Sequence, residues 1–144
     1  LDLRAKLSWL NYCDILFLSA KNKKFFKALR RSIIKTILIR KKKISTGELN
    51  RAVSNLIERN SIYVKKANGA RLKVKYVSMV RSDPPTFLFF VNKSKDIPEN
   101  YRRYLKNGLR EEFKLDNTPI HLIFRTGAEM KKRGGTELPV ENVD

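Results

Sequence analysis

The sequence predicts an α+β fold built around a helix–strand–strand–helix–strand unit, with a shorter helix–strand–helix segment before it. In two stretches apolar residues recur every three or four positions, which is typical of amphipathic helices. Three other stretches are alternating or continuously apolar, which is typical of strands. Two helices on one face of a three-stranded sheet would bury both apolar stripes and leave the basic residues outside.

The first 41 residues predict the shorter segment. Leu3, Leu7 and Leu10 lie at helical spacing, and a second helix is expected over residues 25–40. Between them, residues 14–19 form a short apolar run that is typical of a buried strand in a parallel sheet. Because a lone strand of such a sheet lacks partners, we expect local disorder or non-native packing there. The basic run 40–43 marks a boundary.

The main unit begins at Ser45. Ser45 and Glu48 fit a capping box, in which each side chain satisfies a backbone N–H of the other residue. The helix that follows carries a clean apolar face: Leu49, Ala52, Val53, Leu56 and Ile57. The second helix follows Pro98, which suits a first helical turn. Its apolar stripe consists of Tyr101, Leu105, Leu109 and Phe113.

Three strands are expected between and after these helices. After a turn at Asn68–Gly69, residues 71–81 alternate, with the even-numbered Leu72 to Val80 facing the core. Residues 87–91 are apolar on both faces, as in a central strand. Residues 120–125 alternate again as the last strand. Residues 42–127 therefore form one domain, and residues 128–144 are expected to be a flexible tail.

Composition limits the function. The 144 residues include 32 Lys+Arg and 14 Asp+Glu, a formal net charge of +18, so the first partner to consider is a polyanion. Eleven of the basic residues lie between residues 21 and 43, where there is no acidic residue. One cysteine and one histidine exclude a disulfide within the chain and a metal site rich in either residue. No apolar run is long enough to span a bilayer, so we expect a cytoplasmic protein that binds no membrane.

Catalytic chemistry has little support. No glycine-rich phosphate loop occurs, so we expect this chain alone not to hydrolyse nucleotides. Residues 92–96 resemble a guanine-reading Asn-Lys-x-Asp motif, but Lys95 replaces the aspartate, and a polar loop is the better interpretation. His121 on an alternating strand and Cys13 before an apolar run are interpreted as structural residues.

Nucleic-acid binding is the best-supported chemistry. Arg71, Lys73 and Lys75 recur along one strand face at ~6–7 Å, close to the spacing of consecutive phosphates. Further basic residues could extend this surface, on the helices and at the end of that strand: Lys27, Arg30, Arg31, Lys35, Arg81, Arg102, Arg103, Lys106 and Arg110. Exposed aromatic residues are not evident, which favours phosphate contacts over base reading.

Several ordered motifs then point to a family. Ser19-Ala20-Lys21 follows an apolar run and resembles the last guanine-binding motif of Ras-like GTPases. The later motifs are residues 44–50 (Ile-Ser-Thr-Gly-Glu-Leu-Asn), Pro84-Pro85 with the strand to Asn92, residues 101–113, Pro119-Ile120 and Phe124-Arg125. Together they resemble the C-terminal region of the Der/EngA family, bacterial GTPases with two tandem GTPase domains and a KH-like domain.

The resemblance implies that residues 1–41 end an α/β P-loop GTPase domain and that residues 42–127 form the KH-like domain. It implies a role in assembly of the large ribosomal subunit, with ribosomal RNA as partner. GTP or GDP and Mg²⁺ would bind only in a complete protein, where Ser19, Ala20 and Lys21 would contact guanine. The Gly-x-x-Gly loop of ordinary KH domains is absent, so basic side chains would have to make the RNA contacts. The alternative is a docking module that packs on the GTPase domains and relays their nucleotide state without binding RNA.

Overall fold

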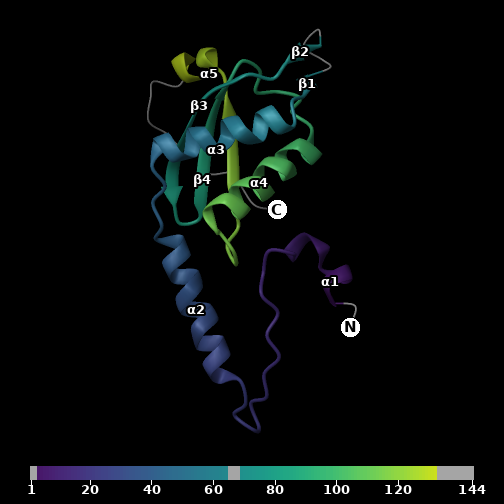
Figure 1. Ribbon diagram of the computed structural model, residues 1–144, viewed down its shortest axis with the longest axis vertical. Coiled ribbons are helices and arrows are strands. Elements are labelled where there is room, and N and C mark those ends of the chain that lie inside the picture. Colours follow the sequence, from purple (N-terminus) through teal and green to yellow (C-terminus); the bar gives the residue numbers. More distant parts are fainter. Residues whose placement is uncertain (1–2, 65–68, 133–144) are drawn as a thin grey trace.

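The computed structural model describes residues 3–64 and 69–132 (Figure 1). Before the main unit lie α1 (Leu3–Lys6), the 3-10 helix η1 (Ser8–Leu10) and α2 (Phe26–Arg40). The main unit contains α3 (Thr46–Arg59), the short strands β1 (Tyr63–Val64) and β2 (Ala70–Arg71), and the longer strands β3 (Val74–Ser82) and β4 (Pro85–Val91). It ends with α4 (Glu99–Phe113), β5 (His121–Arg125) and α5 (Gly127–Lys132).

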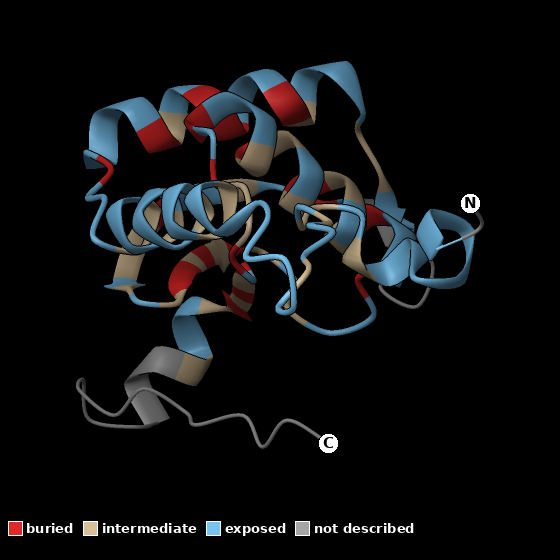
Figure 2. Cartoon of the chain, turned by 90° about the horizontal axis from the view of Figure 1, so that it is seen from below, coloured by how far each residue is buried: buried red, intermediate tan, exposed pale blue. Residues whose placement is uncertain are grey.

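The main sheet has three strands in the order β3-β4-β5. Strand β4 runs antiparallel to β3 and parallel to β5, and α4 makes the crossover that a parallel pair requires. Helices α3 and α4 cover one face of this sheet, and the buried residues gather between the two layers (Figures 1 and 2). The predicted α+β order, with both helices on one face, is confirmed.

The two covering helices form where the sequence predicts them. The side-chain oxygen of Ser45 accepts a hydrogen bond from the Glu48 N–H, so the capping box is confirmed. All four residues of the predicted α4 stripe, Tyr101 to Phe113, are buried. The helices approach closely at Gly108, where an added Cβ would lie 2.4 Å from Leu56 Cδ2. The Tyr104 hydroxyl donates to the Leu56 carbonyl at 2.8 Å and ties the helices together at the same point.

Strand β3 departs from the predicted alternation. Its pairing with β4 shifts between Val74 and Tyr76 and again between Met79 and Arg81. Each bulge adds one residue, so the side chains after it change face. Val77 is therefore fully buried, whereas Tyr76, which was predicted to face the core, is 43% exposed. The predicted phase is correct at Leu72 and Val74, wrong from Tyr76 to Met79, and correct again at Arg81, after the second bulge.

Two asparagine side chains bind backbone groups as a neighbouring strand would. Asn50 on α3 accepts from the Val77 N–H and donates to the Val77 carbonyl, at 2.8 and 2.7 Å. Because β3 is at the edge of the sheet, these bonds satisfy groups that would otherwise be unpaired. Asn92, after β4, accepts from the Lys73 N–H and donates to the Arg71 carbonyl. This use of Asn92 agrees with the interpretation of residues 92–96 as a polar loop.

The short antiparallel pair β1–β2 was not predicted from the sequence. The predicted turn at Asn68–Gly69 lies partly outside the described residues, since Asn68 is not described. Gly69 has φ +66°, a left-handed conformation that glycine adopts without strain.

The segment before the main unit differs most from expectation. Helix α2 is confirmed, but none of its residues is buried. Residues 14–18 form no strand, and an isolated bridge between Ser19 and Lys24 is the only pairing recorded for residues 14–25. Phe17 is 64% exposed, so the prediction of a buried strand is wrong for this chain. The physical reason is that no described strand lies beside this run to accept its hydrogen bonds and cover its apolar side chains.

The predicted tail begins with regular structure. Residues 127–132 form α5, in which the Glu129 carboxylate accepts from the Thr126 N–H and the Ser94 hydroxyl, at 2.7 and 2.8 Å. These bonds lower the pKa of Glu129, led by the one from the Thr126 backbone. Residues 128–132 of the expected tail are thus helical, and its remainder, 133–144, lies outside the described residues.

Candidate nucleic-acid interface

Arg71, Lys73 and Lys75 form a group of exposed cations that we call the strand cluster. The residues lie on β2, on the link to β3 and at the first bulge of β3, rather than on one straight strand. The two bonds from Asn92 fix the backbone of Arg71 and Lys73. The Arg71 guanidinium donates to Ser61 Oγ at 2.6 Å. The backbone under this cluster is therefore anchored while its charges face solvent, as phosphate contacts require. Arg81, near the other end of β3, is also exposed.

The four predicted cations of α4 divide into two kinds. Arg102 donates to the Ile97 carbonyl at 3.3 Å, and its guanidinium lies 4.9 Å from the centre of the Phe124 ring. Arg110 donates to the carbonyls of Leu115 and Thr118, at 2.5 and 2.8 Å. Burial lowers the pKa of Arg110. Both guanidinium groups thus hold the domain together, which leaves less of them available to a ligand.

Arg103 and Lys106 have no such bonds among the described residues, and they line a cleft of about 540 Å³. Trp9, Tyr12 and His121 also line it. Trp9 is 70% exposed. The strand cluster lies on β2, the link after it and β3, and none of its residues lines this cleft. The cleft cations and the strand cluster therefore form two separate groups.

The segment before the main unit is attached to the α4–β5 loop. Asn117 and Asp14 form two hydrogen bonds of 2.6 Å, from the Asp14 N–H to Asn117 Oδ1 and from Asn117 Nδ2 to Asp14 Oδ2. The Asn117 N–H donates to the Tyr12 carbonyl at 3.0 Å. The Arg110 guanidinium lies 4.1 Å from the centre of the Tyr12 ring, a cation–π distance. We call Tyr12, Asp14, Arg110 and Asn117 the joint.

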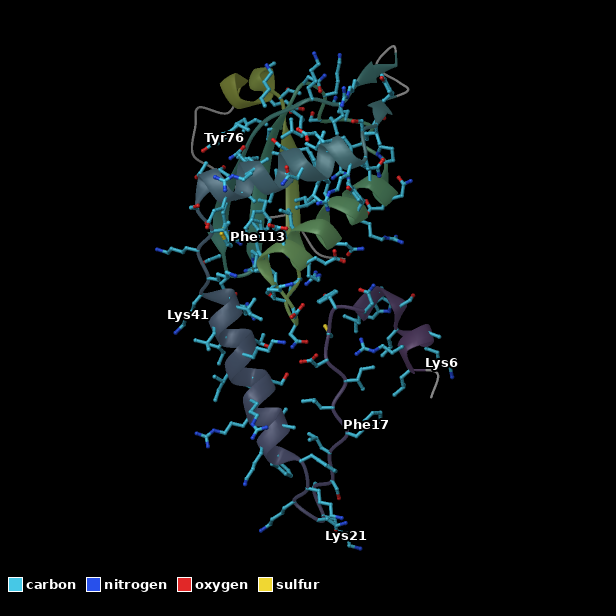
Figure 3. All side chains as sticks on the ribbon, viewed as in Figure 1. Lys6, Phe17, Lys21, Lys41, Tyr76 and Phe113 are labelled. Carbon is cyan, nitrogen blue, oxygen red and sulfur yellow. The ribbon has the colours of Figure 1, made fainter. Side chains whose placement is uncertain are left out.

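The predicted guanine loop lies away from the main unit: Figure 3 shows Lys21 at the far end of the extended segment, beyond Phe17. Ser19 accepts two hydrogen bonds, from the Asn22 N–H to its hydroxyl and from the Lys24 N–H to its carbonyl. Ala20 and Lys21 are exposed. Helix α2 then returns to the main unit, with its predicted basic residues exposed and with Lys35 paired to Asp116 at 3.5 Å.

The described residues contain no group of three or more His, Cys, Asp or Glu side chains placed to hold a metal ion. No described helix is long and apolar enough to cross a membrane. Sequence reasoning missed two features: the asparagine contacts to the backbone and the outward position of Tyr76. Asparagine is a poor helix former, so its presence inside a helix, as at Asn50, is a weak signal that its side chain binds the backbone of another element.

The chain is similar to known proteins over most of its length. Residues 43–125 match a family described as the KH-domain-like, C-terminal part of EngA bacterial GTPase enzymes. A GTPase Der from Sulfurihydrogenibium sp. is 37% identical over 132 residues, which cover 92% of this chain and 29% of that protein. A GTPase Der from Bacillus mycoides is 38% identical over 124 residues, which cover 86% of this chain and 28% of that protein. The chain thus spans less than a third of the length of these curated relatives.

Proposed function

The chain belongs to the Der/EngA family, and we propose that it is the C-terminal part of a GTP-binding ribosome-assembly factor. In this proposal the factor acts in the cytoplasm on the large ribosomal subunit, and the KH-like domain contacts ribosomal RNA through basic side chains. GTP or GDP and Mg²⁺ would bind in a complete protein, with Ser19, Ala20 and Lys21 at the guanine. The chain itself has no phosphate loop, so hydrolysis is assigned to residues outside it.

The observation that best supports RNA binding is the strand cluster. Its three cations are exposed, Asn92 holds the backbone of Arg71 and Lys73, and none of the three has an ion pair among the described residues. Arg81, Arg103 and Lys106 are secondary contacts in this proposal, and Arg102 and Arg110 contribute mainly through the domain structure. Phosphate contacts of this kind make affinity fall steeply with salt.

The test is binding of structured ribosomal RNA across a salt series beginning near 50 mM, the range in which phosphate contacts dominate. Changing Arg71, Lys73 and Lys75 together to Glu should weaken binding of all sequences alike. The slope of log affinity against log salt should also decrease by about one for each lost contact.

A matched control changes Lys27, Arg30 and Arg31 on α2 to Glu, which alters the net charge equally at another place. If both triple variants lose the same affinity, the strand cluster is not a specific contact. If the unchanged chain retains no RNA near 50 mM salt, RNA binding itself is refuted.

The joint supports the second candidate function, a module that relays nucleotide state. Residues 15–18 connect Asp14 at the joint directly to the proposed guanine loop at Ser19. A shift of that loop on nucleotide exchange would therefore act on the α4–β5 loop through a short stretch of chain. Cross-linking of a complete protein in its GDP and GTP forms tests this role. Strand-cluster residues that stay buried against a GTPase domain in both forms would favour docking over RNA contact.

A further inference from the structure

The face of the main sheet opposite α3 and α4 carries a pattern that the strand cluster does not include. The pairing registers place nine side chains on this outer face, in three rows across β3, β4 and β5. The rows are Tyr76–Phe90–Arg125, Ser78–Leu88–Ile123 and Arg81–Thr86–His121. The burial pattern supports the assignment, because the alternate residues Val77, Phe87 and Phe89 are fully buried under the helices. None of the nine residues is acidic.

One row presents an aromatic pair beside cations. The Tyr76 and Phe90 rings have centroids 5.7 Å apart with their planes inclined at 46°. Tyr76 is 43% exposed, so a large part of its side chain remains open to a ligand. Figure 3 shows Tyr76 on β3, at the side of the main sheet. Lys75 precedes it in the bulge, and Arg125 lies across the sheet next to Phe90.

We propose that this outer face binds single-stranded RNA, with an unpaired base stacked on Tyr76 and the neighbouring phosphates held by Lys75, Arg81 and Arg125. An aromatic ring on a sheet face stacks any base, and nearby cations neutralise the backbone. The absence of acidic side chains among the nine favours a polyanion over a protein partner. Glu129, just beyond β5, has its carboxylate bound by Thr126 and Ser94.

This inference rests on the proposed RNA binding and adds to it. The strand cluster accounts for phosphate contact with RNA of any shape, whereas stacking on Tyr76 requires a base that is free of a duplex. The two parts of the surface should therefore respond differently to the form of the RNA and to salt. Loss of a stacking contact lowers affinity without changing the number of phosphates neutralised, so the salt slope stays constant.

The experiment compares a single-stranded RNA decamer with a duplex of the same sequence, using the full 144-residue chain. Tyr76→Ala should weaken binding of the single strand about tenfold, leave the duplex unchanged and keep the salt slope. Tyr76→Phe should bind within about twofold of the original chain, because the stacking ring remains. Tyr76→Leu keeps an apolar side chain on the strand but lacks the ring, so it should also weaken binding of the single strand about tenfold. This variant tests the stacking contact if Tyr76→Ala does not fold.

Tyr63→Ala is the matched control, since Tyr63 is 64% exposed and lies on β1, outside the main sheet. It should leave single-strand affinity unchanged. A direct reporter is also available because Trp9 is the only tryptophan in the sequence. In the double variant Trp9→Phe/Tyr76→Trp, single-stranded RNA should quench the tryptophan fluorescence and the duplex should not.

Three results would overturn the inference. Salt-dependent RNA binding that is insensitive to both Tyr76→Ala and Tyr76→Leu would remove the stacking site while leaving the proposed function standing, and would leave the face to a protein partner. An equal loss with Tyr63→Ala would place the stacking on the β1–β2 pair. A chain that binds neither RNA near 50 mM salt would refute the proposed function together with this inference.

Discussion

The close crossing of α3 and α4 at Gly108 leads to a prediction about Gly108→Ala. This substitution should destabilise the protein when residue 56 is leucine and stabilise it when residue 56 is alanine. In Gly108→Ala the new methyl group would lie 2.4 and 2.7 Å from the two Leu56 methyl carbons and 3.1 Å from Leu56 Cγ. Leu56 must change rotamer or shift to clear these contacts, and it is only 9% exposed, so its surroundings are packed. Overpacking of this kind costs ~1–3 kcal/mol. Alanine gains ~1 kcal/mol over glycine inside a helix.

The two contributions leave Gly108→Ala less stable by ~0–2 kcal/mol. Leu56→Ala alone should cost ~2–5 kcal/mol, because it empties a buried site. In that background the methyl group at residue 108 has no atoms to displace, so Gly108→Ala should stabilise by ~1 kcal/mol. The expected coupling between the two sites is therefore ~1–3 kcal/mol, with the sign set by removal of the clash.

The assay is urea unfolding followed by circular dichroism on all four members of the cycle, comparing midpoints at constant m-value. Gly47→Ala is the matched control, because its added Cβ would have no atom within 4 Å and should not respond to Leu56→Ala. Stabilisation by Gly108→Ala in the presence of Leu56, or an equal effect in both backgrounds, would refute the reasoning.

Three further predictions concern the cap, the sheet edge and the exposed segment. Ser45→Ala should cost ~1 kcal/mol in urea unfolding. The hydrogen bonds from Ser45 lower the pKa of Glu48, so the stabilisation they give is present above the ordinary pKa of 4.5 and is lost as pH falls through the lowered pKa. If the stability of Ser45→Ala fell with acid pH in the same way as that of the original chain, this reasoning would be contradicted. Asn50→Ala should cost ~1–3 kcal/mol by leaving the Val77 N–H and carbonyl without their partners. In Asn50→Asp a carboxylate oxygen replaces the donating amide and faces the Val77 and Thr46 carbonyls, so the loss should be at least as large; unchanged stability in both variants would contradict this. Residues 15–18 should exchange their amide hydrogens rapidly, because no strand pairs with them, and strong protection measured by mass spectrometry would show that this segment is packed after all.

Much of the main unit could be predicted from the sequence because its local signals and its packing agree. The capping box at Ser45 and the apolar stripes of α3 and α4 point to the same buried layer as the apolar run of β4. Each helix places its stripe against the sheet without any need to change phase. Agreement between local preference and tertiary packing is the condition under which sequence patterns are most informative.

Strand β3 shows where such reasoning stops. Alternation alone assigned Tyr76 to the core, because strict alternation assumes a strand without an inserted residue. The bulge depends on how β3 pairs with β4, a tertiary property. For this reason the sequence did not reveal that Tyr76 is an exposed aromatic residue on the outer face, and this part of the candidate site was missed. The cations of the strand cluster were found because their exposure does not depend on that phase.

The strand prediction for residues 14–18 is wrong for the opposite reason, because their local pattern is clear but no neighbouring strand is present among the described residues. A continuous apolar run predicts a strand only when neighbouring strands supply hydrogen bonds and cover both faces. Among the described residues the segment is held at its ends instead, by Asp14 at the joint and by the bridge from Ser19 to Lys24. The joint is therefore the part of this segment that the main unit itself stabilises. The proposed guanine loop is linked to the α4–β5 region through the joint and also through α2, where Lys35 pairs with Asp116 and, just after the helix, Lys42 donates to the Phe113 carbonyl at 2.7 Å. The joint hydrogen bonds, at 2.6 Å, are shorter than the 3.5 Å ion pair between partly exposed side chains, so the joint is a stronger link than that ion pair.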